Sequence, residues 1–463
     1  MKLRALLASL VLTILAATLL SYQPKVDSRL AGAIRGAEKN GWIPVRLTGT
    51  PEQIGYQHGY LLTREIDDAL KVTRLSLMHD TKREWGFFRT AAEQMMWPKI
   101  DEEYRQELRG MSDGLAAHGV KADIYDLVVL NASLEWSYYT STLDKGKSTP
   151  APDRCSAFVA TGSYTRDGQP VIAHNNWSGY LEGARWNVIF DIRPAKGYRI
   201  LMDGFPGFIH SGDDFGMNSA GLVITETTIT QFHGFDTNGI PEFVRARKAM
   251  QYATNIDEFT ALMKEGNNGG YANTWLVADL NRNEIGRLEL GLQNVNLART
   301  KDGYFTGSNF PIDPKLTADE TDFPAQDGSV SANARRARWE QLMAEYKGKI
   351  DQESAKKFLG DHFDAFENKA GKPSERTLCG HVDLSGRGLK PWQSEYGPAG
   401  TVQAKSATAA MAKRMQMEAA MGHSCGLHFR AAEFLKKYPQ YGWLKPLLKD
   451  VPSRPWTVFE AGQ

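Results

Sequence analysis

Apolar residues recur at intervals of three and four through the first third of the chain, most clearly over residues 51–78 and 102–119. This spacing places them on one face of a helix and the intervening charges on the other. We therefore predict a mostly helical section from Thr50 to about Tyr139. Residues 144–154, which are rich in Pro, Lys, Ser and Asp, interrupt this pattern and predict an exposed loop.

The pattern becomes that of strands after this loop. The apolar segments after residue 154 are short, rich in β-branched residues and bounded by Gly, Asp or Asn. Strands are predicted at residues 155–160, 170–175, 187–192, 221–229 and 274–280, and helices at 241–253, 256–266, 334–346 and 406–421. Strands in the middle and helices at both ends predict an α+β fold with antiparallel sheets covered by helices.

Composition excludes several classes of function. The chain has 463 residues, a formal net charge of +1, 42% hydrophobic residues and 24% charged residues, as an ordinary globular protein does. Because the charge is near neutral and no basic runs occur, we expect no nucleic-acid partner. No Walker loop, dinucleotide fingerprint, Gly-x-Ser-x-Gly elbow or His-Glu-x-x-His motif is present, so we expect no cofactor.

The first residues have the order of an export signal. Two basic residues precede an apolar run over residues 5–20, which is slightly shorter than the roughly 20 residues that span a bilayer. We predict a signal peptide over residues 1–22 and a periplasmic or secreted protein. The small-residue cleavage site is poor, so an uncleaved membrane anchor through residues 5–20 is the alternative.

Three cysteines are an odd count for an oxidising compartment, where paired cysteines persist as disulfides. Cys379 and Cys425 lie in similar Gly- and His-rich settings. We therefore favour a disulfide between them and expect no metal, with Cys155 left alone. The alternative is a zinc site, for which the residue types are suitable although neither half has a standard zinc spacing. Its ligands would come from Cys379, His381, His423, Cys425 and His428.

Cys155 is the candidate nucleophile, because it opens the block of strands directly after the predicted loop. A catalytic cysteine needs a base or a positive neighbour that generates its thiolate. A cut between Arg154 and Cys155 would create an α-amino group, whose usual pKa is roughly 7.7 to 8.0, close in space to a thiol whose usual pKa is roughly 8.5. One residue would then hold both nucleophile and base. The alternative is a thiol that only packs at the start of an apolar strand.

His174 is the obvious partner for Cys155, and the strand register decides whether the two can meet. A tight hairpin turn at Asp167–Gly168 would leave His174 about 20 Å from Cys155 along the strand. A wider loop centred near Tyr164, with Gly162 as a breaker, would bring His174 opposite Cys155. A catalytic role for His174 requires the wider loop; otherwise it is a histidine satisfied within a polar strand end.

A side-chain amide is a further candidate. In "NNGGYANTW", Asn273 follows glycines at the mouth of a predicted strand. An amide in this position would be able to donate to a developing oxyanion. The spacing fits a turn asparagine equally well.

Several motifs together resemble a known family. "CSAF", "AHNNW", "FPGFIHSGDDF", "GLVITETTI" and "YANTW" occur in the order and approximate spacing of the phospholipase B-like proteins. Those are N-terminal nucleophile (Ntn) hydrolases that cleave themselves before a cysteine. "GYQHGYLL", "CGHVDL" and "GHSCG" look more like bacterial relatives of the isopenicillin N acyltransferase type, which share that fold and maturation. The resemblance reaches from about Tyr56 to Phe429.

The resemblance implies a four-layer αββα Ntn-hydrolase sandwich of two antiparallel sheets, preceded by a helical section. Self-cleavage between Arg154 and Cys155 would divide the chain into a helical pro-segment, residues 23–154, and a catalytic region, residues 155–463. The two cleaved chains would stay associated.

The resemblance also implies roles for individual residues. Cys155 would attack a carbonyl, its freed amino group would accept and return the proton, and Asn273 would help to hold the oxyanion. His174 matches the histidine that phospholipase B-like proteins carry after the nucleophile. Arg335 is matched to an arginine near the acyltransferase active site, with Arg336 and Arg338 as competing matches.

Two positions depart from these patterns. Arg154 precedes the nucleophile where Gly or Ser is more familiar, so self-cleavage needs a direct test. Ser178 stands where the acyltransferase-type proteins tend to have an aspartate, which favours the phospholipase B-like side.

The hypothesis from the sequence is an exported, self-processing cysteine hydrolase that cleaves an acyl amide or ester bond. Its substrate would be a lipid or an acylated small molecule. Acyl transfer to an amine is the second enzymatic hypothesis, and a non-catalytic exported binding protein on the same scaffold is the third.

Overall fold

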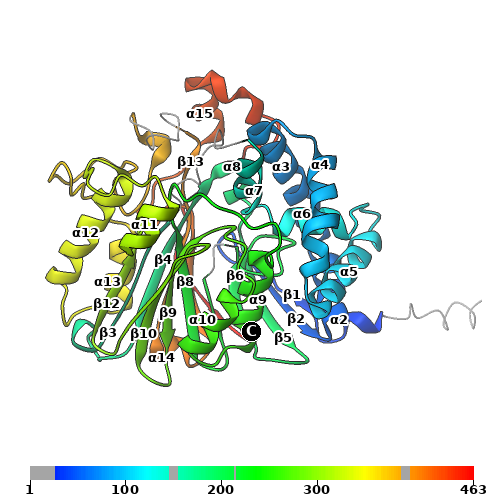
Figure 1. Cartoon of the computed structure of the whole chain (residues 1–463), viewed down its shortest axis with the longest axis horizontal. Helices are drawn as coiled ribbons and strands as arrows, with labels where there is room; N and C mark the ends of the chain where they lie inside the picture. The colour runs from blue at the N-terminus through cyan, green and yellow to red at the C-terminus, as the bar shows by residue number, and fades with distance from the viewer. Residues whose placement is uncertain (1–26, 145–154, 213–214, 387–396, 463) are drawn as a thin grey trace, which may run out of the picture.

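Two β-sheets lie face to face between layers of helices (Figure 1). This computed structural model describes residues 27–144, 155–212, 215–386 and 397–462. The predicted signal or anchor at residues 1–22, and Arg154 with most of the predicted loop before it, lie outside these ranges. No helix within the described ranges combines the length and the apolar character needed to cross a bilayer.

The two sheets confirm the predicted α+β fold. The nine-stranded sheet has the order β1-β2-β5-β6-β7-β8-β9-β10-β11, and the six-stranded sheet has the order β12-β3-β4-β13-β14-β15. Neighbouring strands are antiparallel, with the exception of the parallel pair β2 and β5. The strands of the first sheet are β1 (Ile34–Arg35), β2 (Ile43–Gly49), β5 (Val188–Pro194), β6 (Ile200–Gly204), β7 (Gly216–Asn218), β8 (Leu222–Thr228), β9 (Asn273–Asp279), β10 (Glu284–Leu290) and β11 (Val295–Thr300). Those of the second sheet are β3 (Cys155–Thr161), β4 (Val171–Gly179), β12 (Gly303–Gly307), β13 (Ala399–Thr408), β14 (Gln416–Met421) and β15 (Thr457–Glu460).

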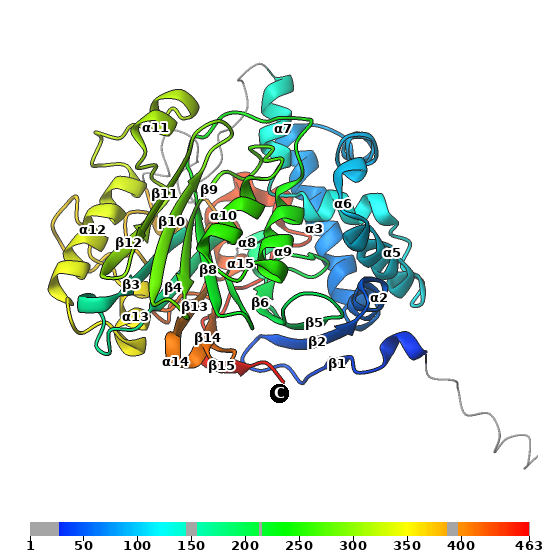
Figure 2. The same cartoon turned by 60° about the horizontal axis from the view of Figure 1, so that its bottom comes forward.

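Helices cover the outer face of each sheet, and Figure 2 shows α9 and α10 lying across the nine-stranded one. The helices packed on this sheet are α2 (Pro51–Leu61), α3 (Thr63–Thr81), α4 (Trp85–Ala91), α5 (Glu102–Ala116), α6 (Ile124–Asn131), α9 (Glu242–Tyr252) and α10 (Ile256–Lys264). The six-stranded sheet is covered by α12 (Ser331–Glu345) and α13 (Gln352–Leu359). Shorter helices are α7 (Trp136–Leu143), α8 (Tyr180–Gly183), α11 (Pro314–Glu320), α14 (Ala409–Ala412) and α15 (Ala431–Lys437).

Strand β3 shows how the layers are held together. Its side chains alternate between two cores, because successive residues of a strand point to opposite faces. Val159 packs into the core between the sheets with Leu276 of β9, whereas Phe158 packs outward against Trp339 of α12. Both faces are therefore apolar, which explains the nearly continuous hydrophobic run that predicts this strand. The layers are those of the αββα sandwich that the resemblance implied.

One predicted helix is wrong. Residues 406–421 form the end of β13, the short α14 and β14. Their alanines favour a helix locally, but β13 is held by β4 on one side and β14 on the other, so that Lys405 lies opposite both His174 and Ala419. Pairing in the sheet therefore overrides the local helix propensity.

The helical section before the loop also contributes to the sheet. Strand β2 precedes the first predicted helix, and its residues pair with β5 from Ile43 opposite Val188 to Gly49 opposite Pro194. The predicted pro-segment, residues 23–154, thus supplies an internal strand of the nine-stranded sheet as well as helices.

Helices α2 and α5 approach each other closely because glycines line their contact. Gly55 and Gly59 face α5, and Gly110 and Gly114 face α2. A Cβ atom at Gly55 would lie 1.7 Å from the carbonyl oxygen of Glu107, so no side chain fits between the two backbones.

We predict that Gly55→Ala destabilises the protein by about 1–3 kcal/mol, because the added methyl group forces the two helices apart. The midpoint of urea denaturation measures this effect. Gly86→Ala in α4 is the matched control, since its methyl group would have no neighbour within 4 Å. This control is expected to be neutral or stabilising by up to about 1 kcal/mol. Equal stability of the two variants would contradict the close helix contact.

Candidate active site

The register of β3 and β4 brings His174 next to Cys155. His174 lies opposite Ala157, two residues along β3 from Cys155, and is therefore a diagonal neighbour of Cys155 on the same face of the sheet. Neither predicted register is correct, because the pairing falls between the tight hairpin and the wider loop. A turn at Asp167–Gly168 does form, but the 3-10 helix η4 (Gly162–Tyr164) widens the connection before it.

A thiol, an imidazole and a carboxylate meet at this point. The Cys155 thiol donates to Oε1 of Glu226 over 3.8 Å, and the reactive atoms of Cys155, His174 and Glu226 all lie within 4.8 Å of one another. Glu226 belongs to β8, so the cluster joins the two sheets. Tyr271 donates its hydroxyl to the same Oε1 at 2.9 Å. All three groups are buried, and their types suit nucleophilic catalysis or metal binding.

Arg335 holds the backbone at the start of β3. Its Nη1 donates to the carbonyl oxygen of Cys155 at 2.5 Å and to Oγ of Ser156 at 3.1 Å, and its Nη2 donates to Oδ1 of Asn309 at 3.1 Å. The guanidinium also lies over the ring of Trp177, 4.2 Å from its centre. A planar group with several fixed donors is suited to join so many partners at once. The predicted Arg335 is therefore brought to Cys155 by the fold.

The two competing arginines lie elsewhere. Arg336 is half-buried, lies over the ring of Phe310 and pairs with Glu340 one turn along α12. Arg338 pairs with Asp361 at 2.8 Å. Helical geometry explains the difference, because neighbouring residues of a helix point in different directions.

Asn309 is a site residue that the sequence interpretation missed. Its Oδ1 accepts the backbone N–H of Cys155 at 3.3 Å, and its Nδ2 donates to the carbonyl oxygen of Thr228 at 2.9 Å. Asn309 has a φ of +72°, which asparagine tolerates better than most residues. The sequence feature that could have identified Asn309 is its position directly after the strand-like segment "GYFTGS". Glu226 and Tyr271 were also missed, since nothing in their spacing connects them to Cys155.

Asn273 is connected to Asn309 through Thr228. It is the first residue of β9 and pairs with Thr228 of β8, the residue whose carbonyl oxygen binds Asn309. Its side chain is fully buried, and neither its Nδ2 nor its Oδ1 has a hydrogen-bond partner among the described residues. A buried amide without partners is rare in folded proteins and marks a place where a ligand is able to supply them.

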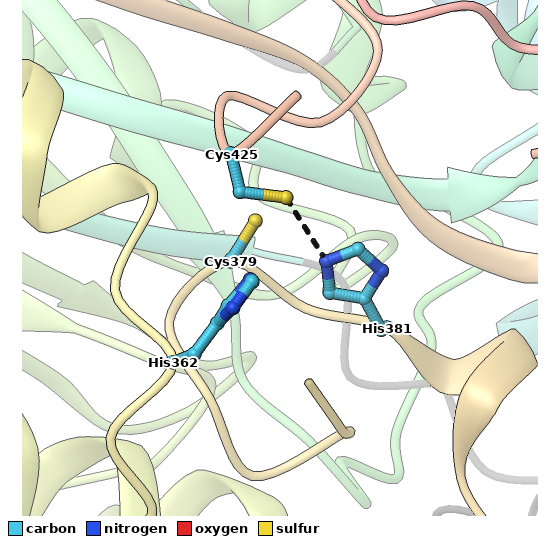
Figure 3. Close-up of side chains that lie close together, drawn as sticks. All are labelled: His362, Cys379, His381 and Cys425. Carbon is cyan, nitrogen blue, oxygen red and sulfur yellow. Dashed lines mark hydrogen bonds between the residues drawn. The ribbon is translucent and has the colours of Figure 1, made fainter. Parts of the chain in front are cut away.

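Cys379 and Cys425 do not form the predicted disulfide in this structure, where both are free thiols. They lie beside each other together with His362 and His381 (Figure 3). The neighbouring Cys379, His362 and His381 side chains hold the pKa of the Cys425 thiol well below its usual value, whereas burial raises the pKa of Cys379.

Comparison with protein families identifies one family. A family model described as Phospholipase B matches residues 97–453. An uncharacterized protein of Archaeoglobus fulgidus is 26% identical over 257 residues, which cover 52% of this chain and 42% of that protein. Putative phospholipase B-like 2 of Caenorhabditis elegans is 25% identical over 207 residues, 41% of this chain and 35% of the relative. The chain thus aligns with less than half the length of these relatives.

A solved structure is similar over much of the chain. A mutant of the conjugated bile acid hydrolase from Clostridium perfringens aligns with a TM-score of 0.35 and 11% identity, and the alignment covers 57% of this chain and 88% of that one.

We predict that Arg335→Met lowers the free energy of unfolding by about 3 kcal/mol or more, because three buried acceptors lose a charged donor together. Urea denaturation followed by circular dichroism measures the loss. Arg336→Met is the matched control on the same helix and is expected to change stability by less than about 0.5 kcal/mol. Similar effects of the two substitutions would show that the contacts of Arg335 contribute little.

Proposed function

The chain belongs to the phospholipase B family, and on that premise we propose that it is a self-processing cysteine hydrolase of the Ntn type, exported from the cell, that cleaves an acyl amide or ester bond. The observation that carries the proposal is the arrangement at Cys155. Its thiol lies beside His174 and Glu226, and its backbone N–H is bound by Oδ1 of Asn309. This arrangement has a place for a nucleophile and for the amino group that a cut before Cys155 would create.

Maturation would begin at the bond between Arg154 and Cys155. The thiol attacks the carbonyl carbon of Arg154, the C–N bond breaks, and the nitrogen takes the thiol proton, which leaves a thioester. The break of the C–N bond frees the α-amino group of Cys155. Water then hydrolyses the thioester, which frees the thiol and leaves Arg154 with a carboxylate. Arg335 and Asn309 support this step, because their hydrogen bonds fix the backbone on the product side of the bond.

Turnover would repeat the same chemistry on a substrate. The α-amino group accepts the proton of the Cys155 thiol, and the sulfur attacks the acyl carbon. Nδ2 of Asn273, which has no other partner among the described residues, donates to the oxyanion. The protonated amino group then returns the proton to the leaving amine or alcohol. Water hydrolyses the thioester and releases the carboxylic acid.

A cavity at the end of β4, with apolar side chains over much of its lining, fits the acyl part of a substrate. It measures about 510 Å³ and includes Ser178 and Gly179 in its lining. Asn176, two residues earlier in β4, pairs with Cys155, so the cavity begins about 7 Å along the strand from the nucleophile. Apolar side chains in the lining are Leu77, Leu134, Leu181, Trp186, Phe205 and Trp443. Pockets of this size and character bind small apolar ligands.

We predict that Cys155→Ala abolishes both chain cleavage and substrate turnover, because it removes the nucleophile of both reactions. Mass spectrometry under denaturing conditions distinguishes one intact chain from two fragments, the larger beginning at Cys155. Cys155→Ser retains a weaker nucleophile and serves as the matched variant, with slow cleavage expected. A wild-type chain that stays intact and inactive would refute the proposal, as would full activity of Cys155→Ala.

We predict that kcat/KM rises about fourfold for each methylene added to the acyl group until the cavity is filled, since burial of one CH₂ contributes about 0.8 kcal/mol. A series of acyl esters and amides of increasing length measures this dependence. Trp443→Ala is expected to weaken the dependence on chain length, and Trp456→Ala, outside the cavity lining, is the control. A rate that does not depend on acyl length would exclude this cavity as the acyl site.

A further inference from the structure

A second cluster of reactive side chains lies apart from Cys155. His362, Cys379, His381 and Cys425 each offer one ligand atom, and these four atoms lie within 4.8 Å of one another. Figure 3 shows the two sulfur atoms next to each other, with the two imidazole rings beside them. Cys379 and His381 are buried, and His362 and Cys425 are half-buried. The cluster is therefore enclosed, but it is not sealed from solvent.

The separations within the cluster suit a tetrahedral metal ion. With Zn–S bonds of about 2.3 Å and Zn–N bonds of about 2.0–2.1 Å, tetrahedral angles place ligand atoms about 3.3–3.8 Å apart. The separation from Sγ of Cys425 to Nε2 of His381 is 3.4 Å. Two thiolates and two imidazoles are a ligand set that zinc prefers.

We propose that His362, Cys379, His381 and Cys425 bind one Zn²⁺ ion as a structural site. Four protein ligands fill the tetrahedral coordination of zinc and leave no position for a substrate or a reactive water. The site is therefore distinct in kind from the proposed catalytic centre, and it does not depend on the function proposed for Cys155.

The site would join segments that have little other regular structure. His362 follows α13, Cys379 and His381 precede the 3-10 helix η5 (Val382–Leu384), and Cys425 follows β14. Between α13 and β13, the described residues form η5 and isolated bridges but no α-helix or strand of a sheet. A bound metal ion supplies folding free energy to such a region, because its ligands converge only in the folded chain.

Neighbouring groups hold the ligands in place. The ring of His423 stacks on that of His381, with centres 3.8 Å apart and planes 10° apart. Nε2 of His423 hydrogen-bonds the hydroxyl of Tyr180 at 2.9 Å. Outer contacts of this kind orient metal ligands. Nε2 of His362 is buried without a hydrogen-bond partner among the described residues, and a disulfide between the cysteines would not supply one.

The proposed zinc site is linked to Cys155 by direct packing. Gly380 lies so close to Trp177 that a Cβ atom would come within 2.1 Å of its ring. Arg335 also lies over that ring, and it donates to the carbonyl oxygen of Cys155. Asn175, beside His174 in β4, donates to the carbonyl oxygens of Leu359 and Leu378 at 2.8 and 2.9 Å. A bound metal ion would thus stabilise Trp177 and strand β4, which pack next to Cys155.

Metal analysis of the purified full-length chain tests the proposal. We expect about one zinc ion per chain, and Co²⁺ in its place should give the visible absorption of a tetrahedral site with thiolate ligands. Cys425→Ser and His362→Ala should lose the metal and unfold at a lower temperature. His428→Ala is the matched control, because His428 lies three residues from Cys425 but outside the cluster. It should keep the metal.

The cobalt spectrum requires no variant, so the test stands even if a substitution prevents folding. Absence of stoichiometric zinc together with a Cys379–Cys425 disulfide in the mass spectrum would overturn the proposal. Retention of zinc by the folded His362→Ala and Cys425→Ser variants would overturn it as well. Failure of Cys155 to react would leave the metal content unchanged, so the two proposals fail separately.

Discussion

The buried guanidinium of Arg335 is the contact on which the centre of the molecule depends. Arg335 belongs to the outer helix layer, and its guanidinium binds the first residues of β3 in the six-stranded sheet. Removing a guanidinium from water is costly, and the cost is offset here by the oxygens of Cys155, Ser156 and Asn309 and by the ring of Trp177. These partners come from three separate segments. A charge that needs all of them at once therefore specifies how the segments fit together.

Local patterns in the sequence predict part of the fold. The strands β3, β4, β5, β8 and β9 and the helices α9, α10 and α12 lie where periodicity places them, since burial on one or both faces leaves a clear signature. The segment at residues 406–421 could not be predicted in the same way, because its helical propensity is overridden by pairing with β4. The register of β3 and β4 depends on η4, a single turn of 3-10 helix for which the sequence has only a glycine as a signal.

Only those site residues that lie in recognisable sequence motifs could be predicted. Cys155, His174 and Arg335 were recognised from motifs, and in the structure His174 lies beside the Cys155 thiol while Arg335 binds the Cys155 carbonyl oxygen. Glu226, Tyr271 and Asn309 come near Cys155 only through the tertiary fold. The same limit applies to the cysteine and histidine cluster. Cys379, His381 and Cys425 were considered together, but His362 lies in a loop far from a standard spacing and enters the cluster only through the fold. Long-range neighbours of this kind leave no pattern within a short window.

The place of β2 has a consequence for a molecule that is cut before Cys155. This strand lies between β1 and β5, and the segment that carries it also contributes α2 and α5 to the core. In the intact chain, unfolding and refolding are unimolecular. In the cut molecule the same strand belongs to a separate polypeptide, so refolding becomes a bimolecular association whose extent depends on protein concentration. A cut molecule of this architecture would keep its structure while folded but would regain it poorly from dilute solution.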